Sequence, residues 1–440
     1  MKKKKRRQPF ARLKWERRQE QNPAMVTLQQ ETEVVGSAPE KDQNLQGRLI
    51  QGDNFAIMAA LLPEFRDSID LVYADPPFLT GNVYAARIGR GEDSRKPEAW
   101  HTTEGYQDAW SDGAAYLDMI YPRLCMIHEL LAPTGTLYLH LDWHASAYAR
   151  VLLDEIFGPD MLLNEIVWVY HGPSPIRTAF KRKHDTILVY TKSDEYTFNA
   201  DAVRVPYASS TVKTFESSPK AGFGKQPDLE RGKVPEDWWY FPVVARLHSE
   251  RTGYPTQKPE ALLERIIVAS SDPGDLVADF FCGSGTTPVV ASRLGRRWIA
   301  CDLTPIAIQT TYRRLLLEQS TSSFSLWRTQ ESPTETDVSV ECRVRSQGVE
   351  VSLELESLEF GKSQTEPFPD NVILWEVDWK YDGQVFHSRS QALRRWRDKN
   401  IDLVLTYSYD TPGRYSIRIR AVDLLGRVGV TSFQLEIPND

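Results

Sequence analysis

Two short motifs contain acidic, glycine and aromatic residues at points where buried strands are expected to end. The first is DFFCGSGTT, which begins at Asp279. Its glycines, Gly283 and Gly285, allow the backbone to approach a ligand, and the helix that follows offers free N–H groups. Asp302 ends the next expected strand, where an acidic residue can bind ribose hydroxyls. Because Pro288 occupies the third glycine position of GxGxxG, an adenosyl cofactor without a pyrophosphate fits better than a dinucleotide.

The second motif is Asp75-Pro76-Pro77-Phe78, which also follows an expected strand. An exocyclic amino group of a nucleic-acid base is a poor nucleophile because its lone pair is delocalised into the ring. Hydrogen bonds from its N–H groups to the Asp75 carboxylate and the Pro76 carbonyl would make it more tetrahedral and more nucleophilic, and the prolines would hold both acceptors in place. Phe78 offers a face on which a flipped base can stack. A proline-rich structural turn is the alternative for these four residues alone, and the glycine motif in the same domain disfavours it.

The elements that must position both motifs alternate between strands and helices from about residue 48 to residue 319, as in an α/β domain. The expected strands are 49–53, 69–74, 135–141, 165–170, 186–191, 276–281 and 298–301. The expected helices are 55–62, 114–131, 145–157, 261–270, one that ends near 294, and 305–318. Periodicity fades between about 194 and 251, and an insert of this length in a compact domain is usually functional.

Residues 46–318 resemble the permuted, β-class amino-methyltransferases of DNA, the adenine-N6 and cytosine-N4 enzymes of bacteria and their phages. The DPPF motif is similar to their catalytic motif and DFFCGSGTT to their cofactor motif. The run YPTQKPE, from Tyr254 to Glu260, matches the segment that precedes their cofactor strand. All three occur in the order of that class, with the catalytic motif first. The resemblance implies an S-adenosylmethionine-dependent methyltransferase with a Rossmann-like, seven-stranded, circularly permuted sheet.

The resemblance also implies roles for individual residues. The catalytic residues would be Asp75, Pro76, Pro77 and Phe78. The residues that would bind S-adenosylmethionine are Asp53, Thr256, Lys258, Pro259, Asp279, Phe281, Gly283, Gly285, Thr286 and Asp302. Asp53 would lie near the adenine of the cofactor, and Thr256, Lys258 and Pro259 near its methionine part.

Two regions of the α/β domain are candidates for contact with the substrate. The stretch from about 194 to 251 would occupy the target-recognition position, where Trp238, Trp239, Lys213 and Lys225 are candidates for contact with DNA. The aromatic-rich region from 106 to 121 is expected to form a helix and a loop over the active site. Packing is the alternative role for every one of these side chains.

The expected reaction is transfer of the methyl group of S-adenosylmethionine to the exocyclic amine of a flipped base in double-stranded DNA, with S-adenosylhomocysteine as the product. Asp75 favours adenine N6, because the cytosine-N4 enzymes of the class more often carry Ser at this position. Cytosine-N4 methylation is the nearest alternative. An RNA methyltransferase is disfavoured because those relatives usually carry Asn there and are not permuted. A catalytically silent DNA-binding protein is disfavoured by the intact Asp75, Gly283 and Gly285.

The regions outside the α/β domain have their own compositions. Residues 1–45 are expected to form a disordered basic arm, since the first 21 residues contain ten Lys or Arg and two Glu. Such an arm either contacts phosphates or only solubilises the chain. Residues 320–340, rich in Ser, Thr and Glu, are expected to form a linker. Residues 341–440 alternate with a period of two and resemble a PKD or immunoglobulin-like β-sandwich.

Composition disfavours several other classes of protein. No run of about 20 apolar residues predicts a membrane span. The four cysteines lie far apart, which is typical of a reduced, intracellular chain without a disulfide framework or a zinc site. His140, Asp142 and His144 have a metal-like spacing, but no further ligands join them, so no metal is expected. The protein is expected to be cytoplasmic and bacterial or phage-encoded. Any restriction subunit would be a separate chain, and a solitary enzyme and a homodimer both stay open.

Overall fold

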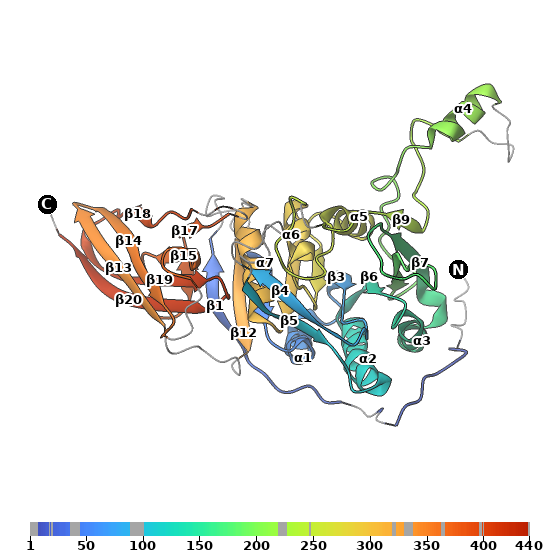
Figure 1. The fold of residues 1–440 in the computed structure, drawn as a ribbon, viewed down its shortest axis with the longest axis horizontal. Helices are drawn as coiled ribbons and strands as arrows, with labels where there is room; N and C mark the ends of the chain where they lie inside the picture. The colour runs from blue at the N-terminus through green and yellow to red at the C-terminus, as the bar shows by residue number, and fades with distance from the viewer. Residues whose placement is uncertain are drawn as a thin grey trace.

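A computed structural model of the chain describes residues 8–16, 18, 21–35, 45–88, 101–218, 227–245, 248–318, 323–329, 338–361, 366–395, 398 and 400–438. An α/β domain and an all-β region lie side by side along the longest axis (Figure 1). Within the described ranges, no helix combines the length and the apolar character that a membrane crossing requires.

A central sheet of eleven strands, in the order β16-β1-β12-β2-β11-β10-β3-β6-β8-β7-β9, organises the α/β domain. Its middle strands are β2 (Leu45–Gln51), β11 (Arg297–Asp302), β10 (Leu276–Asp279), β3 (Ile69–Ala74), β6 (Leu131–Leu141), β8 (His184–Thr191) and β7 (Leu162–Val169). All of these are parallel except β8, which is antiparallel to both of its neighbours. The predicted seven-stranded, permuted sheet is therefore present, and the prediction was wrong only about the extent of the sheet.

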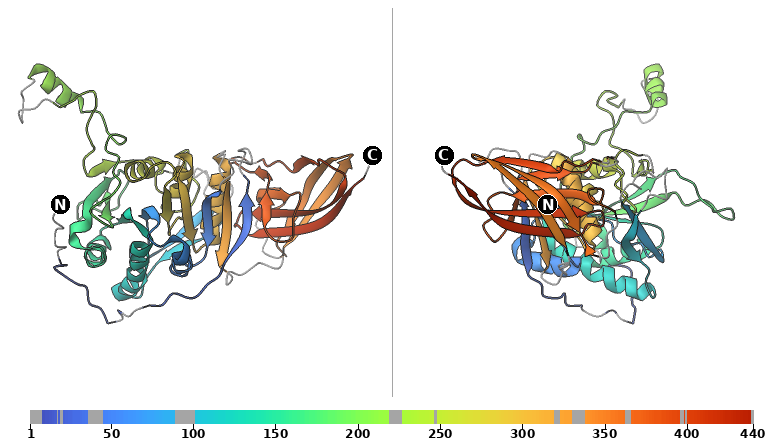
Figure 2. Two further views of the ribbon diagram at one scale, coloured as in Figure 1. Left: turned by 180° about the vertical axis from the view of Figure 1, so that it is seen from behind. Right: turned by 60° about the vertical axis from the view of Figure 1, so that its left-hand side comes forward.

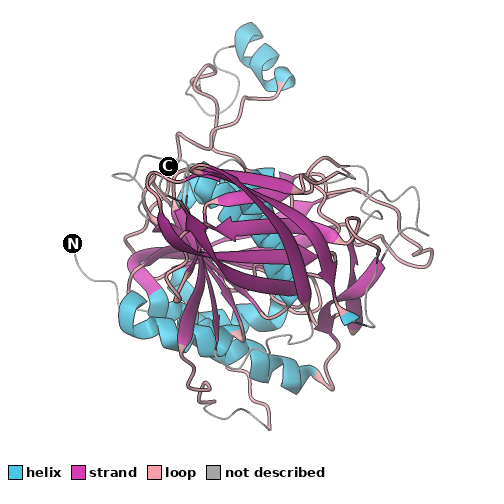
Figure 3. Cartoon of the chain, turned by 90° about the vertical axis from the view of Figure 1, so that its left-hand side faces the viewer, coloured by secondary structure: helices cyan, strands magenta, loops and turns pink. Residues whose placement is uncertain are grey.

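Helices cover both faces of these strands, as Figure 3 shows. One face packs against α1 (Asn54–Phe65), α2 (Gly113–Leu130) and α3 (Ser146–Ile156). The other packs against α5 (Glu260–Ser270), α6 (Thr286–Arg293) and α7 (Pro305–Leu317). Burial on both faces explains why the central strands β3 and β10 consist mostly of apolar residues. All six predicted helices are confirmed within a few residues of their expected bounds.

The predictions of a disordered arm and of a linker were each wrong about one segment that forms a strand. Within the expected arm, β1 (Leu28–Val34) pairs with β12 and with β16. Within the expected linker, β12 (Ser323–Thr329) pairs in parallel with β2. β1 is mostly polar, and β12 lies in a Ser/Thr/Glu-rich stretch, but pairing within the sheet satisfies their backbone groups, and this long-range contact outweighs local composition. Residues 1–7 of the arm lie outside the described residues.

The N-terminal segment before β1 also contacts the helices. The Trp15 indole N–H donates to Asp118 on α2 (2.6 Å), and Arg18 forms an ion pair with Glu155 on α3 (2.6 Å). The described part of the expected arm therefore lies along the α/β domain (Figure 1).

The C-terminal region consists of two sheets, as predicted. One contains β13 (Ser339–Gln347), β14 (Glu350–Glu359) and β18 (Val404–Ser408), and the other contains β17 (Ser390–Leu393), β15 (Val372–Asp378), β19 (Gly413–Asp423) and β20 (Val428–Ile437). Trp375 and Trp379 are fully buried in this region. It joins the α/β domain through β16 (Phe386–Ser388), which extends the central sheet. Buried Glu376 accepts from Tyr312 on α7 (2.7 Å), so the two regions share a polar contact as well.

Five further elements lie in connections of the α/β domain. A hairpin, β4 (Asn82–Ile88) and β5 (His101–Asp108), follows the DPPF motif; the region after Asp75 was not predicted to contain strands. A short 3-10 helix, η4, spans Pro159–Met161, and β9 (Trp238–Tyr240) pairs in parallel with β7. The helix α4 (Ser209–Ser217) buries none of its residues and projects from the body (Figures 1 and 2).

Candidate active site

A cavity of about 590 Å³ lies at the carboxyl edge of the central sheet. Ligands of α/β proteins bind in such crevices outside the carboxyl ends of the strands. Twelve of the fourteen predicted site residues line it: Asp53, Asp75, Pro76, Pro77, Phe78, Thr256, Lys258, Asp279, Phe281, Gly283, Thr286 and Asp302. The other two, Pro259 and Gly285, do not line this cavity. The structure thus brings together three motifs that are far apart in the sequence.

Asp75 follows β3 directly and carries two carboxylate oxygens in different surroundings. Oδ2 accepts a hydrogen bond from the Lys258 ammonium group, which also donates to the Thr256 carbonyl (3.3 Å). Oδ1 is buried and has no hydrogen-bond partner within the described part of the chain. A buried acceptor without a donor is rare in folded proteins, so Asp75 Oδ1 is available to an incoming N–H group in the cavity.

Lys258 links the catalytic motif to the cofactor motif. Its side chain is buried beside Asp75, and its Nζ lies 5.4 Å from the centroid of the Phe78 ring. Its backbone carbonyl accepts from Thr286 Oγ1 at the start of α6 (3.1 Å). The sequence placed Lys258 in a cofactor segment, and nothing local indicated that its ammonium group would contact the catalytic carboxylate.

The turn that carries Phe78 is held by Asp108, a residue that the sequence analysis missed. Its buried carboxylate accepts from three consecutive backbone N–H groups, those of Phe78 (3.1 Å), Leu79 (2.8 Å) and Thr80 (3.0 Å). Leu79 has a φ of 68°, a left-handed conformation that is unfavourable for a residue with a side chain. Trp110, which also lines the cavity, donates its indole N–H to the same carboxylate (3.1 Å). Asp108 therefore fixes both the turn and an aromatic wall of the site.

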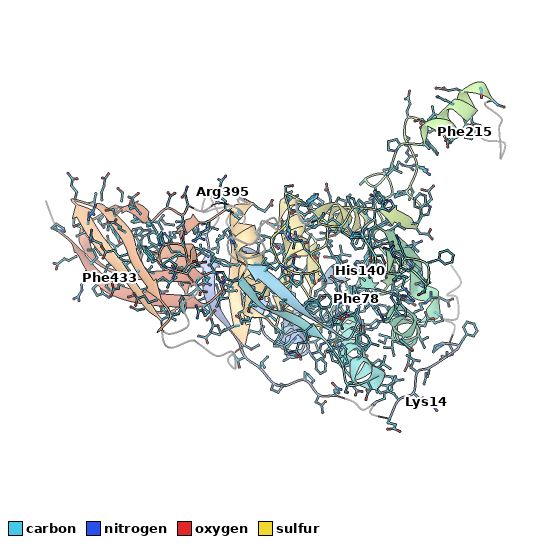
Figure 4. All side chains as sticks on the ribbon, viewed as in Figure 1. Lys14, Phe78, His140, Phe215, Arg395 and Phe433 are labelled. Carbon is cyan, nitrogen blue, oxygen red and sulfur yellow. The ribbon has the colours of Figure 1, made fainter. Side chains whose placement is uncertain are left out.

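A buried polar chain lies beneath Phe78. The Tyr73 hydroxyl hydrogen-bonds with His140 Nδ1 (2.7 Å), and His140 Nε2 lies 3.2 Å from Asp185 Oδ2. The rings of Phe78 and His140 are 5.8 Å apart, and Figure 4 shows the two residues together in the interior of the α/β domain. His140 thus serves as a support for the catalytic turn.

The metal-like spacing of residues 140 to 144 reflects two separate local roles. Asp142 and His144 pair with each other (2.7 Å), apart from the chain that holds His140. No group of three metal-ligating side chains occurs within the ranges that the structure describes.

The glycine turn between β10 and α6 is held by Asp302. The Gly283 N–H, at a φ of 50°, donates to Asp302 Oδ2 (3.0 Å), while Thr304 donates through its N–H (3.0 Å) and its hydroxyl to Oδ1. Gly285 has a φ of 76°, and a Cβ there would lie 2.5 Å from Thr311 Oγ1 on α7. The need for glycine at 285 therefore comes from helix packing, which the motif alone could not distinguish from contact with a cofactor.

Asp279 is a fully buried carboxyl group at the end of β10. Burial is the main reason that its pKa is raised to about 7, and the negative charges of Asp75 and Asp302 add to the rise. The hydrogen bonds from Thr287 Oγ1 (2.5 Å) and the Phe281 N–H (3.0 Å) lower the pKa and so act in the opposite direction. Such a group favours a positively charged ligand, because a nearby positive charge stabilises the ionised form.

Asp53 and a second missed residue, Arg123, form the far wall of the cavity. Asp53 caps α1 by accepting from the N–H groups of Phe55 (3.0 Å) and Ala56 (3.1 Å), and its other oxygen pairs with Arg123 on α2 (2.7 Å). Arg123 Nε also donates to Asn54 Oδ1 (2.5 Å). Nothing in the periodicity of α2 distinguished Arg123 from the other charged residues on its surface.

The structure divides the four candidates for DNA contact. Trp238 is 61% exposed, whereas Trp239 is only 7% exposed. The Trp239 indole N–H donates to the Glu236 carbonyl (2.9 Å), so for this residue the structure favours packing, the alternative role, over contact with DNA. Lys213 is exposed on α4, and Lys225 lies outside the described residues.

Comparison with known proteins agrees with this geometry. The family model for N6/N4 methyltransferases, described as DNA methylase, matches residues 69–313, more than half of the chain. The chain belongs to this DNA methylase family. It is therefore an S-adenosylmethionine-dependent DNA methyltransferase, as the resemblance of the three motifs implied.

Several known methyltransferases are similar to part of this chain. The DNA adenine methyltransferase YhdJ of Escherichia coli (strain K12) is 30% identical over 286 residues, which cover 64% of this chain and 86% of that protein. The type II methyltransferase M.HpaI of Haemophilus parainfluenzae is 31% identical over 251 residues, 57% of this chain and 68% of that protein. Among solved structures, the cytosine-N4-specific PvuII DNA methyltransferase covers 65% of this chain and 89% of its own, with 18% identity and a TM-score of 0.43.

The pKa of Asp279 gives the methyltransferase a testable pH dependence. S-adenosylmethionine carries a positive sulfonium, so we expect its Kd to fall as the pH rises from 6 to 8, by up to about tenfold as Asp279 becomes ionised around pH 7. Isothermal titration calorimetry across this range measures the change. In Asp279→Asn, the part of the pH dependence of Kd that comes from this carboxyl should vanish. The pH dependence that remains reports the ionisation of the amino group of S-adenosylmethionine itself. Equal pH profiles for the two proteins would contradict the prediction.

Proposed function

We propose that this methyltransferase modifies N6 of adenine at a specific sequence in double-stranded DNA, with the target base rotated out of the duplex. The observation that carries the proposal is Asp75, which lines the cavity and has a buried Oδ1 without a partner in the described structure. An aspartate at the first catalytic position favours adenine over cytosine within this class. The 30% identity to an enzyme named as a DNA adenine methyltransferase supports the same base.

The residues around the cavity fit S-adenosylmethionine. Its volume of about 590 Å³ is in the usual range for a site that encloses a small molecule. The carboxylates of Asp279 and Asp302 and the Gly283 turn would hold the cofactor on one side, and Asp53 would hold it on the other. When bound, the cofactor supplies an electrophilic methyl group attached to a sulfonium. No step of this proposal uses a metal.

The catalytic turn activates the amino group of the target base. Asp75 Oδ1 would accept a hydrogen bond from one N–H of the amine, and the Pro76 carbonyl would accept from the other, which makes the nitrogen more tetrahedral. The Phe78 ring would stack on the flipped base and orient its amine. Lys258 gives the Asp75 carboxylate a counter-charge through Oδ2, so that Oδ1 stays available to the substrate. After methylation the amine is acidic, and Asp75 Oδ1 can take its proton and release it to solvent.

The region between residues 194 and 251 would read the DNA sequence around the target. It carries Trp238 on β9, exposed at the edge of the sheet, and Lys213 on α4, which projects from the body. Figure 4 shows Phe215, also on α4, far from Phe78. A projecting element of this kind can reach DNA several base pairs from the flipped base.

Methyl transfer from labelled S-adenosylmethionine to unmethylated genomic DNA tests the proposal. Mass spectrometry of the nucleosides identifies the modified base, and sequencing of the modified positions gives the recognition site. N6-methyladenine at a defined sequence is the expected result. N4-methylcytosine would overturn the choice of base and keep the site. No label in DNA, despite measurable binding of S-adenosylmethionine, would overturn the reaction.

A further inference from the structure

The connection between β7 and β8, residues 170–183, is an exposed basic loop. It contains Arg177, Lys181, Arg182 and Lys183 and no acidic residue. Phe180 is 98% exposed, the most exposed large hydrophobic side chain in the described part of the chain. The right-hand view of Figure 2 shows this green loop extending away from the body. A basic loop with an exposed aromatic side chain has the composition of a nucleic-acid contact, in which cations meet phosphates and an aromatic ring stacks on bases.

The loop emerges at the edge of the sheet that holds the active site. β8 is antiparallel to both β6 and β7, so β7 runs parallel to β6 and, through it, to β3, which ends directly before Asp75. The carboxyl end of β7, where the loop begins, therefore lies on the same edge as the catalytic turn.

Both ends of the loop are tied to structure around the site. At its start, the Tyr170 hydroxyl donates to Asp185 (3.0 Å), the carboxylate that contacts His140 beneath Phe78. Near its end, the Arg182 guanidinium lies 4.1 Å from the centroid of the Trp143 ring, in the connection that follows β6. The base of the loop is thus fixed, while Arg177, Phe180 and Lys181 are exposed to solvent.

The exposed side chains of the loop fit duplex DNA. Arg177, Lys181 and Arg182 form no ion pair with any described acidic residue, so their charges are available for phosphates. Apolar side chains such as phenylalanine can insert between base steps and unstack them. A flipped base leaves a gap in the stack, and unstacking costs free energy that an inserted side chain offsets.

We propose that Phe180 inserts into the duplex at the position of the target base and holds that base out of the stack, while Arg177, Lys181 and Arg182 contact the flanking phosphates. This inference rests on the proposed function and adds the device that opens the substrate. Phe180 is then a positioning residue, because it acts on the DNA and takes no part in the reacting atoms.

The test compares Phe180→Ala with Phe180→Trp, which keeps a large ring. Their kcat/KM is measured on a matched duplex that contains the recognition site and on the same duplex with an abasic position opposite the target adenine. Phe180→Ala should lose about 10- to 100-fold on the matched duplex and less than about threefold on the pre-opened one, since unpairing is already achieved there. Phe180→Trp should retain most of the activity on both. Phe10→Ala is the matched control, because Phe10 is 91% exposed in the N-terminal segment, and it should behave as the wild type does.

Fluorescence provides a second readout that does not depend on turnover. With 2-aminopurine in place of the target adenine, wild type should raise the fluorescence on binding, and Phe180→Ala should raise it much less at saturating protein. If Phe180→Ala lost the same kcat/KM on the matched and the pre-opened duplex, or lost none on either, the role of Phe180 would be overturned. Methylation by the wild type would still support the proposed function. A change of oligomeric state in Phe180→Ala would instead assign the loop to a contact between copies. An inactive wild type would overturn the proposed function itself.

Discussion

Replacement of Asp75 by asparagine is expected to lower kcat for methyl transfer by roughly 10²- to 10³-fold, the range for loss of one preorganised catalytic group. Asparagine has the same shape but only one acceptor oxygen. If that oxygen faces Lys258, the amide NH₂ replaces Oδ1 and cannot accept from the substrate amine. If it faces the substrate, the NH₂ group faces the Lys258 ammonium, and two donors oppose each other. Neither orientation satisfies both neighbours.

Single-turnover kinetics with saturating DNA measures this loss, and calorimetry measures the Kd for S-adenosylmethionine. The Kd should change less than about threefold, because Asp75 acts on the amine in the proposed mechanism. Lys258→Met, made in the wild type and in Asp75→Asn, completes a double-mutant cycle. Since the ammonium group contacts Oδ2, we expect the two losses to be strongly non-additive. Additive losses, or a large change in cofactor affinity with kcat intact, would contradict the assigned roles.

The sequence was sufficient to predict the middle of the fold, because there local patterns and tertiary structure agree. Strands buried on both faces, such as β3 and β10, are short apolar runs, and the helices that cover them are amphipathic. The order of the three motifs supplied the permuted topology. The strand β1 was missed because it is mostly polar, and β12 because it is a short apolar-polar run within a Ser/Thr/Glu-rich stretch; both pair with distant segments.

The residues of the candidate site also fall into a group that could be predicted from the sequence and a group that could not. Residues within motifs, such as Asp75 and Gly283, could be predicted because their chemistry is encoded by their neighbours in the chain. Arg123, Asp108 and the ammonium group of Lys258 act across the fold: Arg123 pairs with Asp53, Asp108 holds the turn after Phe78, and Lys258 contacts Asp75. Such pairs join residues that are far apart in sequence, and a single sequence has no local signal for them.

Asp108→Ala is expected to produce the second large effect, a loss of both stability and activity. The substitution leaves the N–H groups of Phe78, Leu79 and Thr80 without their acceptor in a half-buried turn, and Leu79 remains in its unfavourable conformation. Hydrogen bonds to a charged group contribute about 1.5–3 kcal/mol each, so a decrease of about 3 kcal/mol in the free energy of unfolding is a conservative expectation. Urea denaturation measures it.

Activity should fall further than stability alone explains. A displacement of the catalytic turn by about 1 Å can cost roughly 10²-fold in rate, so we expect kcat to drop by about that factor at a temperature where the variant is still folded. Asp112→Ala is the matched control, because Asp112 is a nearby acidic residue whose carboxylate caps α2 by accepting from the Ala115 N–H (2.8 Å). It should cost about 1 kcal/mol in stability and leave kcat within about twofold. A small loss of stability in Asp108→Ala, equal to that of Asp112→Ala, together with an unchanged kcat would contradict this prediction. The turn would then hold its geometry without Asp108, and the prolines of the DPPF motif would be sufficient to orient the two acceptors.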